Sequence, residues 1–409
     1  METHIPNLPI SDFWYDLPDD RIARYPVPGR DRSKLLTCIG GKIGEDVFYR
    51  LPEYLASDTL LIGNETRVVQ ARLNFRKAGG ALIELFCLSP GAHFSDIQLA
   101  FTASSPVEWR CLVGNSKRWK QGLLEKEFVI GNEAVRLSAE RLQKSDDSSL
   151  VRFSWQPQNF SFSDILEAAG EVPLPPYLNR QAEEHDKTDY QTLFARHHGS
   201  VAAPTAGLHF TDRVLDDLRS KGIEMATITL HVGAGTFKPV SSASSGNHEM
   251  HAENIVVTRN TIERIVSQLG KPIIPVGTTS MRTLESLYWI GLKINAEVNI
   301  DEVILSQWAP YEPNDGPEVE AHEALHNILN FLDSRGLDRL SASTSLMIAT
   351  GYRFRLSTGL ITNFHQPGST LLLLVAALIG TSWKEVYDYA LEHGFRFLSY
   401  GDSCLFVPE

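Results

Sequence analysis

The stretch from about Val68 to Trp155 differs in texture from the rest of the chain. It consists of short runs of alternating apolar and polar residues, separated by turn signals such as Gly79-Gly80 and Gly114-Asn115. Alternation with a period of two indicates strands, and regularly spaced short strands without helical segments are typical of a small barrel or sandwich. The runs lie at residues 81–86, 109–113, 127–130, 134–137 and 150–153. The sequence therefore predicts a small β-domain inserted into a larger one.

The second half of the chain repeats strand, polar loop and helix several times, which predicts a largely parallel α/β sheet. Strands are expected at residues 59–69, 223–232, 254–257, 272–276 and 360–365, and helices at 162–170, 212–221, 261–269 and 317–334, with one more beginning at 189–194. The expected fold class is α/β, with a larger α/β domain and a small β-barrel domain inserted near the N-terminal third. We assign residues 1–66 and 158–409 to the former and residues 67–157 to the latter.

Charge is distributed unevenly along the chain. The net charge of −12 argues against nonspecific binding of nucleic acid, which depends on Lys and Arg neutralising phosphates. Residues 67–157 nevertheless carry 13 basic against 9 acidic side chains, and the segment Lys117 to Lys120 mixes basic and aromatic residues as single-strand-binding surfaces do. Residues 293–345 carry 3 basic against 10 acidic side chains. This acidic stretch is expected to be an insertion or a partner surface of the α/β domain.

The segment Gly199 to Phe237 contains two loops suited to a ligand. Residues 202–209 precede a helix that Thr211 is expected to cap and Gly222 to end, and residues 231–236 follow the next strand. Both loops are rich in small residues, which let a backbone approach a ligand closely, and both add a His and a hydroxyl. We expect them to face one pocket.

Two further loops have the same character. The residues Gly277 to Ser280 follow a buried strand and begin a helix, so their free N–H groups suit an anion. A capped helix without a ligand explains this pattern equally well. The residues Asn363 to Thr370 also join a strand to an apolar helix.

Cysteines and apolar runs place limits on compartment and metal content. Cys38, Cys87, Cys111 and Cys404 are scattered, which predicts reduced core thiols and no metal site. The longest apolar run, residues 371–379, is too short to span a bilayer. With no targeting segment visible, we expect a cytoplasmic protein without a membrane partner, and a monomer slightly more than an oligomer.

Several segments, in order along the chain, form a set of motifs: Asn64 to Val68, Ala71 to Leu73, Pro173 to Tyr177 with Arg180, Tyr190 to Thr192, Ser200 to Thr211, Leu230 to Phe237, Met250 to Glu253, Val276 to Ser286, Thr362 to Leu374 and Phe397 to Asp402. These segments resemble the S-adenosylmethionine:tRNA ribosyltransferase-isomerase family of queuosine biosynthesis. Gln70 departs from that pattern where a Pro is usual, Gly368 departs where a Lys is usual, and the acidic 293–345 stretch is longer than is common.

The resemblance implies transfer and isomerisation of the ribosyl part of S-adenosylmethionine onto 7-aminomethyl-7-deazaguanine in tRNA. The products are epoxyqueuosine-tRNA, adenine and methionine. S-adenosylmethionine is then a co-substrate, tRNA carrying the deazaguanine precursor is the partner, and no prosthetic group is expected. The resemblance also implies a β-barrel inserted into an α/β domain.

This chemistry needs a base beside the sulfonium and an acid that helps adenine leave. His suits both tasks near neutral pH, so His209, His231, His251 and His365 are the candidates, with Glu253 as an orienting group or second base. Core or capping histidines are the alternative for each of them.

Other residues are candidates for holding the substrates. Phe210 and Phe237 suit a sulfonium cation, with burial in the core as the alternative. Arg282 with Thr278, Thr279 and Ser280 suits the methionine carboxylate, with pairing to Glu285 as the alternative. The remaining substrate candidates are Thr205, Gly207, Gly233, Gly235, Thr236, Asn363, Ser369 and Thr370, and those for tRNA are Arg67, Arg72, Arg180, Lys117 and Arg118.

Rival functions lack their motifs. A methyltransferase would carry G-x-G-x-G after an early strand, a radical enzyme three clustered cysteines, and a serine hydrolase G-x-S-x-G. A catalytically silent tRNA-binding paralogue of the same family is the remaining alternative.

Overall fold

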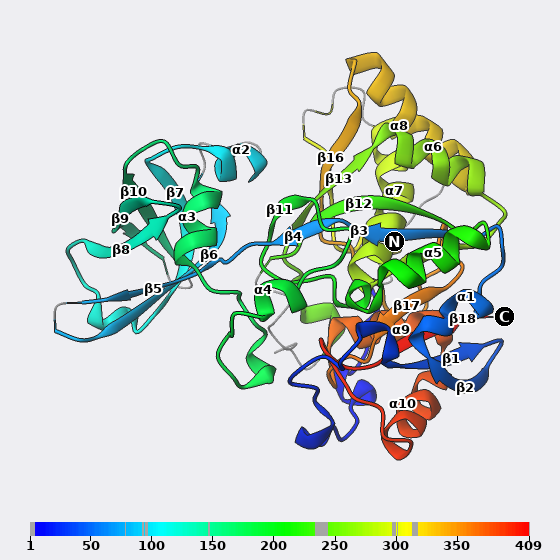
Figure 1. Ribbon diagram of the computed structural model, residues 1–409. Coiled ribbons are helices and arrows are strands. Elements are labelled where there is room, and N and C mark those ends of the chain that lie inside the picture. Colours follow the sequence, from blue (N-terminus) through cyan, green and yellow to red (C-terminus); the bar gives the residue numbers. More distant parts are fainter. Residues whose placement is uncertain are drawn as a thin grey trace.

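The computed structural model describes residues 5–77, 79–91, 94, 97–145, 148–233, 244–296, 300, 302–312 and 318–408. A ten-stranded sheet forms the larger part of the molecule, and a six-stranded sheet forms a separate lobe (Figure 1). A short parallel pair, β4 (Thr66–Val68) with β11 (His197–Ser200), lies where the two parts meet.

The ten-stranded sheet is mixed. Its central neighbours β12, β3, β14 and β17 are parallel, whereas β13 runs antiparallel to β12, and β18 antiparallel to β17. The prediction of a largely parallel sheet is correct for the centre. The flanks mix parallel pairs, such as β1 with β18, and antiparallel pairs, because the apolar pattern of a buried strand does not encode the direction of its neighbour. The strand order is β15 (Ile304–Leu305), β16 (Arg339–Thr344), β13 (Glu253–Thr258), β12 (Glu224–His231), β3 (Leu60–Asn64), β14 (Ile273–Val276), β17 (Leu360–Asn363), β18 (Ser403–Val407), β1 (Lys34–Ile39) and β2 (Lys42–Val47).

Helices cover both faces of this sheet. Successive side chains of a strand point to opposite faces, so Leu60 and Ile62 of β3 enter one core and Leu61 enters another. The first core lies beneath α6 (Arg259–Gln268), α7 (Thr278–Ala296), α8 (Ala321–Arg335), α9 (Thr370–Ile379) and α10 (Ser382–Glu392). The second lies beneath α1 (Leu51–Tyr54) and α5 (Asp212–Ser220).

The helix predicted at residues 212–221 is confirmed as α5. Thr211 caps it by accepting a hydrogen bond from the N–H of Val214 at 3.4 Å, and Gly222 ends it with a φ of 77°. The helix predicted to begin at residues 189–194 is wrong, since α4 (Asp186–Asp189) ends there. The amide of Gln191 instead bonds the backbone C=O and N–H of Val68 at 2.7 and 3.0 Å.

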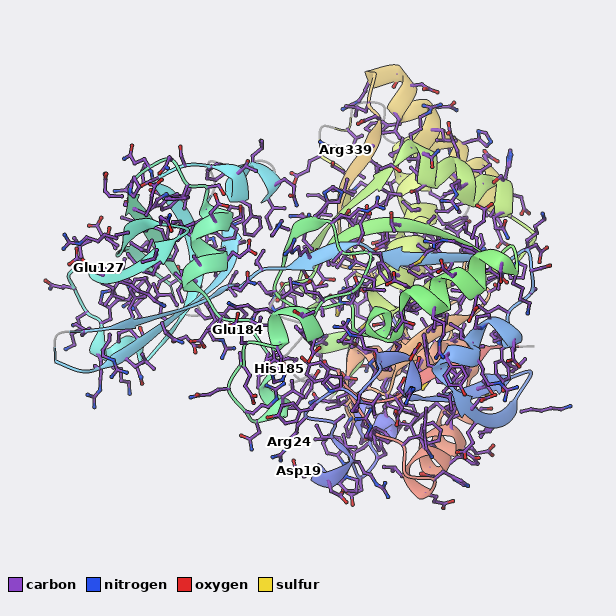
Figure 2. The ribbon with its side chains drawn as sticks, in the orientation of Figure 1. Asp19, Arg24, Glu127, Glu184, His185 and Arg339 are labelled. Atoms are coloured by element: carbon purple, nitrogen blue, oxygen red, sulfur yellow. The ribbon has the colours of Figure 1, made fainter. Side chains whose placement is uncertain are left out.

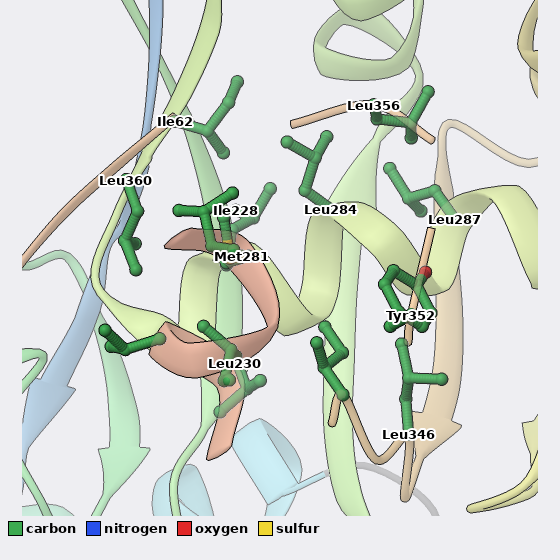
Figure 3. Packing of buried hydrophobic residues seen from close by; sticks show 14 of the residues in the cluster. Ile62, Ile228, Leu230, Met281, Leu284, Leu287, Leu346, Tyr352, Leu356 and Leu360 are labelled. Atoms are coloured by element: carbon green, nitrogen blue, oxygen red, sulfur yellow. The ribbon is translucent and has the colours of Figure 1, made fainter. Parts of the chain in front are cut away.

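The acidic stretch at residues 293–345 is built into the main sheet and core. Strand β16 pairs with β13 over six residues, and α8 buries Leu325 and Ile328 in the first core. The same core is centred on α7, whose Met281 and Leu284 lie beside Ile228 (Figure 3). The described part of this stretch therefore contributes to the fold as well as to the surface.

The six-stranded sheet is wholly antiparallel and has a core of its own. The strands at its two ends, β5 and β8, also contact each other, so the sheet is nearly closed into a barrel. In order it contains β5 (Arg72–Arg76), β6 (Leu82–Pro90), β7 (Val107–Gly114), β10 (Ser149–Gln156), β9 (Glu133–Lys144) and β8 (Leu124–Ile130), with α2 (Ile97–Thr102) and α3 (Phe162–Ala169) beside it. An antiparallel barrel-like sheet is thus confirmed, while the domain boundaries stay a prediction.

The four cysteines and the most apolar helix both belong to the interior. All four thiols are free and buried. Within the described ranges, no single helix has the length and apolar composition needed to cross a bilayer. Helices α9 and α10 meet that test only together, and they are bent by 113°.

Candidate functional site

A cavity of about 430 Å³ lies where the central parallel strands end. Strands β12, β14 and β17 lead into it with their carboxyl ends, and β13, which runs the other way, begins there. Crevices at the carboxyl ends of strands are the usual ligand sites of open α/β sheets. The loops at residues 202–206 and 232–233, which the sequence predicts to share a pocket, both line this cavity.

The structure brings eleven of the predicted site residues to the cavity wall. They are Thr205, Gly233, His251, Glu253, Thr278, Thr279, Arg282, Asn363, His365, Ser369 and Thr370. Gly235, Thr236 and Phe237 lie outside the described residues. Five predicted residues, His209, His231, Gly207, Phe210 and Ser280, are buried elsewhere.

Packing explains why Gly207, Phe210 and Ser280 do not line the cavity. Phe210 belongs to the second core, with its ring 5.1 Å from that of Phe48. A Cβ on Gly207 would come within 2.7 Å of Phe194, so this glycine is required by the packing of the core. Ser280 donates its hydroxyl to the carbonyl of Val276 at 2.8 Å.

His231 and His209 also lie behind the cavity. His231 is buried at the end of β12 against Gly199, where any side chain would overlap the imidazole ring. The φ of 148° at Gly199 also favours glycine. His209 lies behind Asn363, with its Nε2 2.9 Å from the Asn363 amide nitrogen. Neither imidazole lines the cavity, so neither is placed for direct proton transfer to a ligand there.

Glu253 and Arg282 form an ion pair in the cavity wall. Their side chains are only 6% and 10% exposed. Burial lowers the pKa of Arg282 to about 10, which leaves the guanidinium charged at neutral pH. Its Nε has no hydrogen-bond partner in the described part of the chain. The alternative pairing with Glu285 is wrong, because that carboxylate accepts bonds from the Tyr352 hydroxyl and from backbone N–H groups of residues 355–357.

His365 is the most deeply buried imidazole that lines the cavity. Its Nε2 lies 2.9 Å from the hydroxyl of Thr362, the residue before Asn363. Burial lowers the pKa of His365 to about 3, so the ring is neutral near pH 7. His251, in contrast, is exposed at the cavity. The two histidines are therefore suited to different tasks.

Sequence reasoning missed several residues that line the cavity. Tyr177 and Tyr190 contribute aromatic rings, and the Tyr177 hydroxyl lies 2.6 Å from that of Ser399. The stiff segment ending at Tyr177 is the sequence signal for a fixed aromatic group. His248 is also present; burial lowers its pKa, and the neighbouring His251 acts in the same direction.

The segment that carries His248 and His251 is fastened by one side chain that follows β15. Gln307 donates to the carbonyl of His248 at 2.7 Å and accepts from the N–H of Met250 at 2.9 Å. Nothing local in the sequence predicts this contact, because 57 positions separate Gln307 from Met250.

The residues predicted to bind tRNA lie away from the cavity, and they differ in how exposed and how ion-paired they are. Lys117 and Arg118 are exposed, whereas Trp119 beside them is buried, so the expected mixture of basic and aromatic groups is not presented on the surface. Arg67 lies 4.0 Å from Glu167, and Arg72 lies 3.5 Å from Glu84.

Arg180 is a structural ion-pair partner. Its guanidinium forms two bonds of 2.7 Å with the buried carboxylate of Asp186 and packs over the ring of Tyr25. The nearby surface has charges of both signs, such as the 2.8 Å pair of Arg24 and Asp19 (Figure 2). Arg180 therefore stabilises the fold through these contacts.

The fold and cavity together define an α/β protein with a ligand site at its strand ends and a second, barrel-like lobe. Residues 10–406 match the model of the family described as Queuosine biosynthesis protein, and the chain belongs to that family. The family expectation, and with it the expectation of an enzyme of queuosine biosynthesis, is confirmed.

Relatives extend over almost the whole chain. Two proteins with the name S-adenosylmethionine:tRNA ribosyltransferase-isomerase come from Azoarcus sp. (strain BH72) and Ruegeria pomeroyi. The first is 37% identical over 402 residues, covering 97% of both chains, and the second is 36% identical over 411 residues, covering 98% of this chain and 99% of the relative. A crystal structure of S-adenosylmethionine tRNA ribosyltransferase from Thermotoga maritima is 27% identical, covers 97% of this chain and 99% of that chain, and has a TM-score of 0.46.

Proposed function

We propose that the protein transfers and isomerises the ribosyl moiety of S-adenosylmethionine onto 7-aminomethyl-7-deazaguanine in tRNA. Epoxyqueuosine-tRNA, adenine and methionine are the products. The observation that carries this proposal is the cavity of about 430 Å³, which is within the range of small-molecule sites and combines a buried cation, the N-terminus of a helix and aromatic rings. The names of the relatives give the reaction class.

Arg282 is the proposed contact for the methionine carboxylate. Arg282 lines the cavity with a charged guanidinium, and charge-assisted hydrogen bonds to carboxylates are roughly twice as strong as neutral ones. Thr278 and Thr279, in the first turn of α7, line the same cavity and add a helix N-terminus that favours anions. Glu253 holds the guanidinium in place from β13.

The sulfonium is proposed to lie near Tyr177 and Tyr190. A cation near an aromatic face gains about 0.5–2 kcal/mol. Burial raises the pKa of both tyrosine hydroxyls, so they stay protonated and are poor nucleophiles toward the sulfonium. The sequence suggests Phe210 for binding the sulfonium, but Phe210 belongs to the core, and we assign that role to the two tyrosine rings.

Proton transfer is proposed for His251, and orientation for His365. His251 is exposed and can exchange its proton with solvent between turnovers. His365, with a pKa of about 3, is a weak base whose neutral ring accepts hydrogen bonds throughout the working pH range.

One assay tests the reaction. The protein is incubated with S-adenosylmethionine and tRNA bearing the precursor base, and free adenine and methionine are followed. Equal amounts of both are expected. Release of S-adenosylhomocysteine would identify a methyltransferase, and binding of both substrates without turnover would identify a silent paralogue.

A further inference from the structure

Five residues behind and in the cavity wall form a continuous polar chain. The Ser33 hydroxyl lies 2.8 Å from Nδ1 of His209, and Nε2 of His209 lies 2.9 Å from the amide nitrogen of Asn363. That nitrogen also donates to the backbone carbonyl of Asp402 at 3.2 Å. The Thr205 hydroxyl donates to Oδ1 of Asn363 at 2.9 Å. Thr205 and Asn363 line the cavity.

The direction of every bond in this chain follows from one carbonyl. The Asp402 oxygen can only accept, so the Asn363 atom that faces it is the NH₂ nitrogen. The same NH₂ group meets Nε2 of His209, which therefore carries no proton, and the ring proton is on Nδ1. Oδ1 of Asn363 then faces the Thr205 hydroxyl and accepts a hydrogen bond from it.

The outcome at the cavity wall is a pair of acceptors. The Thr205 hydrogen is already used, so its oxygen offers lone pairs, and Oδ1 of Asn363 has a second lone pair. Both NH₂ hydrogens of Asn363 are used on the far side. A ligand group therefore binds most favourably here if it is a hydrogen-bond donor.

The surroundings of His209 preserve this arrangement near neutral pH. Burial lowers the pKa of His209 to about 4. A hydrogen bond with the backbone of Arg30 acts in the opposite direction, and the guanidinium groups of Arg396 and Arg30 lower the pKa further. Asp189 is an acidic side chain that lines the small neighbouring cavity of about 10 Å³, together with His209. The Asp402 carboxylate is bound by the N–H groups of Lys34 and Arg396.

We propose that Thr205 and Asn363 form an acceptor subsite for a hydroxyl or amine group of the substrate, and that His209 is a positioning residue which fixes its polarity. The inference rests on the proposed function and deepens it. Two sources offer the donor: the hydroxyl and ammonium groups of S-adenosylmethionine, and the aminomethyl group of the precursor base in tRNA.

Two variants of Thr205 test the subsite. Thr205→Val keeps the shape and removes the oxygen, whereas Thr205→Ser keeps the oxygen and is the matched control. If S-adenosylmethionine supplies the donor, its Kd, measured by calorimetry without tRNA, is at least about ten-fold higher for the Val variant than for the Ser variant. The reason is that a site built to hydrogen-bond a polar group loses much of its affinity when one hydrogen-bond partner is removed. If the aminomethyl group supplies it, that Kd stays equal and the KM for precursor tRNA rises instead. Equal Kd and KM values for both variants would overturn the subsite.

Variants of His209 test the positioning role. His209→Gln retains an acceptor for the Asn363 amide, and His209→Leu does not. The Gln variant is expected to bind S-adenosylmethionine at least about ten-fold more tightly than the Leu variant and to keep the shape of the pH profile of kcat/KM between about pH 6 and 9. Loss of one limb of that profile in the Gln variant would make His209 a proton carrier and overturn the positioning role.

The two proposals fail in distinguishable ways. Wild-type protein that binds S-adenosylmethionine but releases no adenine with precursor tRNA removes the proposed reaction, while the Kd comparison for Thr205 still decides the subsite. If the wild type turns over and the two Thr205 variants have equal Kd and KM values, the subsite is wrong and the proposed reaction stands. Thermal melting of each variant shows that it is folded, and Thr205→Val still tests the subsite if His209→Leu does not fold.

Discussion

Glu253 and Arg282 form a buried ion pair in the cavity wall, although Glu253 begins strand β13 and Arg282 lies one turn into helix α7. Removing one partner of such a pair leaves a charge in a poorly solvated site. Breaking buried pairs in this way costs about 3–5 kcal/mol, whereas changing both partners leaves no uncompensated charge.

We therefore expect Arg282→Ala to lower the free energy of unfolding by about 3–5 kcal/mol, and Glu253→Ala to do so by a similar amount. The double variant should lose clearly less than the two changes added together. Urea unfolding of the four proteins measures this coupling. Strict additivity would show that the two charges do not depend on each other. Either variant should also weaken the binding of S-adenosylmethionine, if the carboxylate contact is correct.

Helix α8 is expected to be essential to the stability of the main core. A Cβ on Gly291 of α7 would overlap the backbone carbonyl of Ala324 in α8. Gly291→Ala should therefore force the helices apart and cost about 1–3 kcal/mol, as overpacking typically does. Gly79→Ala is the matched control, because nothing lies within 4 Å of its Cβ. Chemical unfolding compares them, and equal stability would mean that α8 packs only loosely.

Stability should fall with acidification between about pH 6.5 and 5. The folded-state pKa values of His209 and His365 are lowered to about 4 and about 3, against about 6.5 in an unfolded chain. In this window the unfolded state binds protons that the folded state does not, so each group costs about 1.4 kcal/mol per pH unit as the pH falls.

Over that window His365 alone accounts for about 2 kcal/mol. Unfolding free energies measured at about pH 5, 6 and 7 should thus depend less steeply on pH in His365→Gln than in the wild type. An unchanged slope would show that His365 takes up a proton in the folded protein.

Basic residues on the barrel-like lobe are expected to differ from Arg180 in their effect on tRNA binding. Lys117→Ser with Arg118→Ser should reduce the slope of log K against log salt by about 0.7–0.9 for each phosphate that is no longer neutralised. Lys271→Ser, just before β14 and so at the opposite end of that strand from the cavity, is the control and should leave the slope as it is.

Arg180→Gln should instead lower thermal stability, because it leaves the buried Asp186 carboxylate without its cation. Filter binding at several salt concentrations, with melting curves alongside, separates the two effects. A full salt slope in the Lys117 and Arg118 double variant would place the RNA on another face.

The sequence by itself determined the local elements of this protein. Caps and turns depend on neighbours in the chain, so Thr211 and Gly222 can be recognised without a structure, and both act as expected. The alternation from Val68 to Trp155 likewise specifies strands, because the period of a strand is local. Loops with small and polar residues indicated which segments approach one cavity.

Only the tertiary structure decided which side chains reach that cavity and in what state. His209 and His365 have the same side chain and similar loops, yet one lies behind Asn363 and the other lines the wall. Glu253, not the helix neighbour Glu285, pairs with Arg282. Burial, partner choice and the direction of hydrogen bonds depend on residues tens to hundreds of positions apart, and no local pattern carries that information. For this reason the candidates follow from the sequence, and their roles follow from the packing.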